Sequence, residues 1–153
     1  MISNDPLYPQ RPFVTQAVVT AANTDIDDSP DANVAELVLP AGAETDGAVI
    51  TGLTALPRGT SAATVLYLYE SLDNGTTRRL VAAAQAAADT VSTTDAPAPV
   101  TFQYQGAAIS ASNPLLVPPG SGAAKPRFFV GASVALAAGW VFRAQGQLLQ
   151  IAG

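Results

Sequence analysis

Short segments in which apolar and polar residues alternate run through most of the sequence, and glycine or proline residues separate many of them. The clearest two are residues 48–56 and 63–71, with Pro57 and Gly59 between them. Alternation with period two places successive side chains on opposite faces of a strand, whereas an amphipathic helix repeats its apolar residues three and four positions apart. The pattern predicts a chain built of β-strands.

Other segments have the same character, and residues 113–122 leave room for one short edge strand. These segments are residues 13–20, 34–39, 76–83, 100–104, 128–136, 139–144 and 147–151. Asp73-Asn74-Gly75 predicts a hairpin, because Asn and Gly tolerate the positive φ values of tight turns. The Ala-rich segment 82–91 has high helix propensity but no apolar stripe, so helix, loop and strand continuation all stay open. About eight strands predict one antiparallel β-sandwich or jelly-roll domain over residues 13–153.

Residues 1–12 carry prolines at a density that favours an extended N-terminal arm. An arm of this kind can lie across a neighbouring subunit, and a frayed or self-packed terminus is the alternative. Loops such as 113–126 are further contact candidates. The arm residues predicted to bind a partner are Pro6, Tyr8, Pro9, Arg11 and Pro12.

Charged residues make up 12% of the chain, and the net charge is −5. Soluble domains average about 25% charged residues. A surface so poor in charge indicates contacts with other subunits, and a polar, uncharged monomer surface is the alternative. One lysine and scattered arginines form no basic stripe, so we expect neither nucleic acid nor an anionic membrane as a partner.

Histidine and cysteine are both absent. Their absence excludes Ser-His-Asp triads, His-ligated zinc, disulfides and thiolate metal sites, so we expect no cofactor and no enzyme. Lys125 lies in a Gly/Pro loop that would not desolvate a catalytic lysine. Glu36 and Glu70 could form a glycosidase pair if a cleft held them ~5 to 10 Å apart, but outward-facing strand positions explain both.

The sequence also offers two candidate binding sites. An acidic loop could offer oxygen ligands to Ca²⁺, although it lacks the glycine and distal glutamate of an EF-hand, and a solvated turn is the preferred interpretation. Trp140 with Tyr69 or Tyr104 could form a sugar-binding platform, although core packing is the preferred interpretation, since most aromatic residues lie at period-two strand positions. The acidic residues are Asp25, Asp27, Asp28 and Asp31.

The first residues have neither a basic start nor an apolar run, so we expect synthesis in the cytoplasm without secretory export. The longest apolar stretch, Phe128 to Phe142, is shorter than the ~17 to 25 residues of a membrane-spanning helix.

Two stretches carry a resemblance to a known group of proteins. In the first, Leu-Pro-Arg-Gly-Thr at 56–60 is followed by Val-Leu-Tyr-Leu-Tyr at 65–69 and by Ser-Leu-Asp-Asn-Gly at 71–75. The second is Val-Ala-Leu-Ala-Ala-Gly-Trp-Val-Phe-Arg-Ala at 134–144. Together with Thr-Ala-Ala-Asn-Thr at 20–24, they resemble small β-sandwich virion proteins of tailed bacteriophages and prophages.

The resemblance implies a capsid decoration, or cement, protein on the outer surface of the virion. Its partners would be the major capsid protein and further copies of itself, with a trimer as the favoured oligomer. The acidic net charge suits the outside of a shell better than its DNA-facing side. A carbohydrate- or receptor-binding module of a tail or fibre is the alternative.

Overall fold

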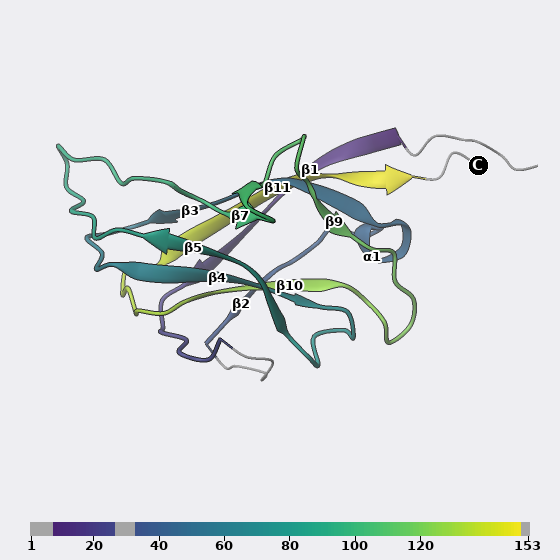
Figure 1. Cartoon of the computed structure of the whole chain (residues 1–153), viewed down its shortest axis with the longest axis horizontal. Coiled ribbons are helices and arrows are strands. Elements are labelled where there is room, and N and C mark those ends of the chain that lie inside the picture. Colours follow the sequence, from purple (N-terminus) through teal and green to yellow (C-terminus); the bar gives the residue numbers. More distant parts are fainter. Residues whose placement is uncertain (1–7, 27–32, 151–153) are drawn as a thin grey trace, which may run out of the picture.

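Two antiparallel β-sheets make up almost all of the regular structure (Figure 1). The computed structural model describes residues 8–26 and 33–150. The chain is all-β, as the alternation predicts. The elements are β1 (Tyr8–Val19), β2 (Ala35–Leu37), α1 (Ala43–Asp46), β3 (Ala48–Pro57), β4 (Thr64–Ser71), β5 (Arg79–Ala86), β6 (Val100–Thr101), β7 (Gln103–Tyr104), β8 (Ala107–Ala108), β9 (Leu115–Val117), β10 (Arg127–Ala132) and β11 (Trp140–Gln150).

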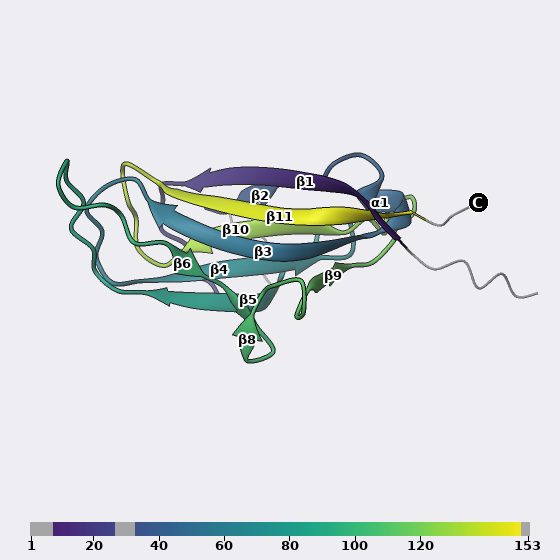
Figure 2. The same cartoon turned by 90° about the horizontal axis from the view of Figure 1, so that it is seen from above.

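The strands divide into sheet A, with the order β1-β11-β3-β6, and sheet B, with the order β2-β10-β4-β5-β7-β8. Strand β9 also pairs with β3. In Figure 1 the main strands of sheet A lie above those of sheet B, and Figure 2 looks down onto sheet A. Strand β11 is central because it pairs with β1 along one side and with β3 along the other.

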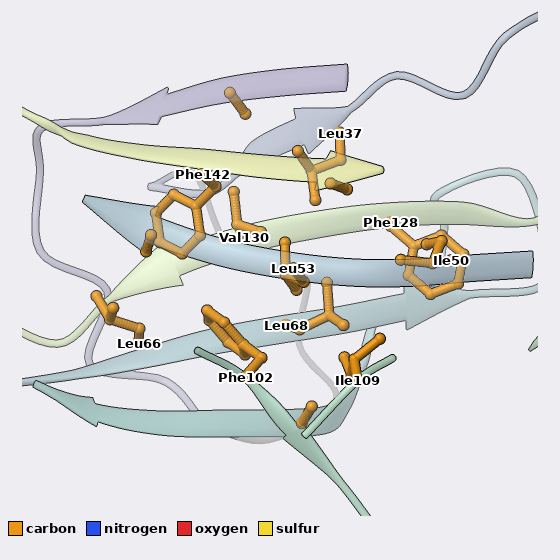
Figure 3. Packing of buried hydrophobic residues seen from close by; sticks show 14 of the residues in the cluster. Leu37, Ile50, Leu53, Leu66, Leu68, Phe102, Ile109, Phe128, Val130 and Phe142 are labelled. Carbon is orange, nitrogen blue, oxygen red and sulfur yellow. The ribbon is translucent and has the colours of Figure 1, made fainter. Parts of the chain in front are cut away.

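Side chains from both sheets meet in one hydrophobic core (Figure 3). Leu53 and Phe142 come from sheet A, and Leu68 and Phe128 come from sheet B. Phe102 packs against Phe142 with ring centroids 6.0 Å apart. Burial of each such side chain contributes about 1.5–3 kcal/mol, so this shared core holds the two layers together.

Segment 100–104 forms two short strands in place of the single one expected. The chain leaves sheet A after β6 and enters sheet B at β7, and the fully buried Phe102 lies at the crossing. The Phe102 N–H donates to the Leu53 carbonyl at 3.1 Å, and the Phe102 carbonyl accepts from Ile109 at 3.1 Å. Both backbone groups of Phe102 are therefore satisfied while its ring fills the core.

Three other segments differ from the simplest interpretation of the sequence. Strand β5 continues through Ala86, so the first half of the Ala-rich segment is strand. Segments 139–144 and 147–151 belong largely to one strand, β11, which passes through Gly146 at a register shift with β3. Strand β1 begins at Tyr8, so residues 8–12 of the expected arm pair with β11.

The hairpin between β4 and β5 forms where Asn-Gly predicts it, with φ of 60° at Asn74 and 90° at Gly75. Its return strand starts at Arg79 instead of at 76, because the Asp73 carboxylate holds a wider loop. One oxygen of this carboxylate accepts from the Thr77 N–H at 2.8 Å and from the Ser71 hydroxyl at 2.7 Å. These bonds, the Thr77 backbone bond first, lower the pKa of Asp73 to about 2.

The pH dependence of this loop is testable with Asp73→Asn. A lowered carboxyl pKa stabilises the fold above its ordinary value of 3.8, and the contribution is lost as the pH falls toward about 2. We expect the variant to melt below the wild type near neutral pH and the gap to close in acid. Thermal unfolding followed by circular dichroism measures both. Asp95→Asn is the control, since that carboxylate accepts no hydrogen bond in the described part of the chain.

Gly146 is a second test, because β11 approaches β3 and β1 too closely there for any side chain. A Cβ at this position would lie 2.2 Å from the Val49 carbonyl oxygen and 2.8 Å from the Phe13 ring. We expect Gly146→Ala to lower the free energy of unfolding by about 1–3 kcal/mol in urea titrations. Gly52→Ala is the matched control, since the three atoms nearest to its Cβ would all belong to the Gln145 side chain, which can move. Equal effects of the two substitutions would contradict this account.

Candidate protein-binding surface

The structure separates the two carboxylates considered as a catalytic pair. In the ladder of sheet B, Glu36 lies opposite Phe129 and Glu70 lies opposite Phe128. Neighbouring residues of a strand point to opposite faces, so these carboxylates lie on different sides of the sheet. They cannot flank one substrate, so the glycosidase pair does not form. The outward position expected of both carboxylates is found for Glu36 only, because Glu70 shares a face with the core residue Phe128.

Each of the charged candidates has a different environment. The Arg127 guanidinium contacts both Glu36 oxygens, at 3.1 and 3.2 Å. Burial raises the pKa of Glu70 above its ordinary value. Lys125 forms an ion pair with Glu44 at 3.1 Å, which explains its position in the 120–126 loop without any catalytic role.

The acidic loop is described only in part. Asp27, Asp28 and Asp31 lie outside the described residues, and so does Pro6 of the arm. Asp25 forms hydrogen bonds through its backbone. Its N–H donates to the Asn23 side chain, and its carbonyl accepts from the Tyr69 hydroxyl. Within residues 8–26 and 33–150, no group of three acidic side chains is placed to hold a metal ion.

The aromatic platform is not available at the surface. Trp140 is 1% exposed and Tyr69 is 2% exposed, and Tyr104 alone of the three is partly open to solvent. Trp140 belongs to the core between the sheets. Core packing, the preferred interpretation, is confirmed for Trp140, which strand alternation turns inward, so no exposed surface joins it to Tyr69 or Tyr104.

Tyr69 instead belongs to a second cluster, on the outer face of sheet B. This outer cluster consists of Tyr67, Tyr69 and Phe129, with Val34 and Val65 packed against it. The Arg78 guanidinium carbon lies 4.1 Å from the centre of the Phe129 ring. Val34 packs against the cluster, and Asn23 and Asp25 hydrogen-bond to Tyr69, so the β1–β2 connection covers the outer face of sheet B at β4 and β10.

A hydrogen-bond chain fastens this cover to the sheet. The Asn23 side chain donates to the Tyr69 hydroxyl at 2.9 Å, and that hydroxyl donates to the Asp25 carbonyl at 2.7 Å. Asn23 is itself buried, and its N–H donates to the Ala132 carbonyl at 2.8 Å. The tyrosine hydroxyl therefore joins the segment after β1 to strand β4.

Tyr69→Phe tests this fastening. The substitution removes the hydroxyl and leaves the buried Asn23 amide without that partner, so we expect a loss of about 1–3 kcal/mol in the free energy of unfolding. Tyr67→Phe is the matched control, because Tyr67 lies on the same strand and face and its hydroxyl bonds to no described residue. Similar losses for both variants would refute the role given to the Tyr69 hydroxyl.

Among residues 8–26 and 33–150, none forms such a cover on the outer side of sheet A, where β1, β11 and β3 lie in front in Figure 2. Its inward positions are buried, and its outward positions alternate with them. We call these outward residues the open face. They are Val14, Gln16 and Val18 in β1, Val141, Arg143 and Gln145 in β11, Thr54 and Leu56 in β3, Thr101 in β6 and Leu116 in β9.

The open face has an apolar row beside a polar one. Val18 lies opposite Val141, which lies opposite Leu56. In the neighbouring row, Gln16, Arg143, Thr54 and Thr101 follow one another across four strands. Val14 is 52% exposed and Leu116 is 58% exposed. A face with exposed aliphatic groups and a single charge, Arg143, loses little hydration energy when another protein covers it.

The sequence contained part of this signal. Segment 13–20 is apolar or neutral on both of its faces, whereas a strand with one solvated face commonly carries charged residues there. The sequence does not indicate which sheet a loop covers, because the cover over sheet B depends on contacts between residues distant in the sequence.

The comparisons with known proteins leave the family open. No protein-family model matches the sequence, and no curated protein is significantly similar to it. No helix in the described part of the chain is long and apolar enough to cross a membrane.

Proposed function

We propose that this chain is a bacteriophage capsid decoration protein, built as a β-sandwich, that binds the outer surface of the major capsid protein shell and stabilises it. The open face of sheet A is the observation that carries the proposal. The role is non-enzymatic, since it depends on surface complementarity and copy number.

The character of the open face favours a protein partner. Aliphatic groups that become buried contribute about 25 cal/mol per Å² of apolar surface. The neutral Gln16, Thr54 and Thr101 side chains can pair with polar groups of a partner without the large desolvation cost of charges. A decoration protein needs this combination, because it must remain soluble alone and still bind a preformed shell.

The mechanism is mass action. A ligand that binds only the assembled shell stabilises each site by RT ln(1 + [L]/Kd). A shell repeats the site many times, so modest individual affinities add to a large total. The net charge of −5, with only one cation on the open face, suits the outside of a particle better than its nucleic-acid side.

The resemblance of the 56–75 and 134–144 stretches to phage virion proteins supplies the choice of partner. In the structure these stretches contain the end of β3, strand β4, the beginning of the β4–β5 loop and the first half of β11. They contribute to the core and to sheet B, and through Leu56, Val141 and Arg143 they also contribute to the open face that would contact the shell. The alternative, a sugar-binding module of a tail or fibre, relied on an exposed aromatic platform. Trp140 and Tyr69 are buried, so no observation favours this alternative.

Binding to particles that lack the protein tests the proposal. We expect Leu56→Glu to reduce the affinity for such particles at least about tenfold, or about 1.4 kcal/mol, because it places a charge within the apolar row. Leu72→Glu is the matched control, since Leu72 is 52% exposed against 38% for Leu56 but lies in the β4–β5 loop. Co-sedimentation over a range of protein concentrations gives both affinities.

Mass spectrometry of complete particles supplies the independent check. A decoration protein should be present in copy numbers comparable to those of the major capsid protein. Few or no copies would overturn the capsid assignment, whereas many copies with unchanged binding of Leu56→Glu would overturn only the assigned face.

A further inference from the structure

Strand β1 is the longest edge strand in the described part of the chain. It has 12 residues, whereas the other strands at sheet edges, β2, β6, β8 and β9, have 3, 2, 2 and 3. An edge strand exposes unpaired backbone N–H and C=O groups, and proteins limit this exposure by keeping edges short. Four of these edges follow that rule, and β1 does not.

Only the first part of β1 carries protective features. Pro9, Arg11 and Pro12 lie there together with a register shift, and each of these discourages further pairing. From Phe13 to Val19 the strand has no proline, no charge and no register shift. Within the described residues, no backbone hydrogen bond from a segment other than β11 reaches this stretch.

We propose that the free edge of β1 pairs antiparallel with β1 of a second copy, across a twofold axis at Gln16. Sheet A would then continue from one protomer into the other. This inference goes beyond the proposed function, because it concerns the free edge of the sheet and needs no capsid.

The sequence of the edge is self-complementary in this register. With Gln16 opposite Gln16 of the second copy, Val14 faces Val18 and Thr15 faces Ala17. Val14 and Val18 are 52% and 45% exposed in the single chain. Each would gain one aliphatic neighbour from the second copy, so the dimer would contain two such valine pairs. Two glutamine amides can donate to and accept from each other at the centre. Pro12 falls outside the paired stretch Phe13–Val19.

Electrostatics permit this contact between identical surfaces. The paired stretch carries no charge. The nearest charged residue on the open face, Arg143, lies one strand further in, opposite Gln16. Strands are spaced about 4.7–4.9 Å apart, so the two Arg143 strands would lie about 14 Å apart, beyond the screening length of about 8 Å at physiological salt.

The oligomeric state in solution is the first test. Light scattering coupled to gel filtration, over a dilution series, should give a dimer mass for the wild type. Val18→Lys places two lysines in the contact, so we expect the dimer dissociation constant to rise at least about tenfold. Thr101→Lys is the matched control on the opposite side of the same face and should leave the constant unchanged. A wild type that stays monomeric, or the trimer expected from the sequence, would overturn the proposal.

Single cysteines test the register, and the natural chain has no thiol to interfere. Gln16→Cys should form a covalent dimer under mild oxidation, because the two sulfurs meet on the axis. Val14→Cys should not, since it faces position 18 of the second copy and its own equivalent lies four residues away along the strand. Cross-linking of both variants to the same extent, or of neither, would refute the register.

Discussion

Sheet A depends on the position of β11 between β1 and β3. Both ladders run along most of its length, and no other strand of the sheet has two long partners. The close approach at Gly146 brings three strands together where the β11–β3 register shifts. The inward side chains Trp140 and Phe142 of the same strand then contribute to the core. Pairing and packing are therefore joined in one element.

The outer faces of the two sheets differ in how far other parts of the chain cover them. On sheet B, the aromatic cluster around Tyr69 is covered by residues that flank the β1–β2 connection, and Asn23 fastens that cover. On sheet A, no comparable layer exists among the described residues, and the outward side chains are aliphatic or neutral except for Arg143. A chain with so few charges leaves one broad side suited to protein contact and keeps its aromatic rings inside.

The sequence predicted the strands well where alternation was strong. Strands β3 and β4 lie almost where the pattern predicts them, since a local period of two is enough to identify them. Predictions that depend on distant residues were less accurate. The wide hairpin follows from the hydrogen bonds of the Asp73 side chain. The passage of Phe102 between the sheets follows from packing in the core. The opposite orientation of Glu36 and Glu70 follows from the strand register. Histidine and cysteine counts limited the chemistry but identified no surface.

The topology of sheet A also has a consequence for biosynthesis. Strand β1 pairs with β11 from Tyr8–Gln150 to Val19–Trp140, so β1 has no ladder partner until nearly all of the described chain has been made. During translation its aliphatic residues and both of its edges stay exposed. Contacts of such long sequence separation form slowly and favour association between incomplete chains. A chaperone that holds β1 until β11 emerges would therefore reduce association between incomplete chains.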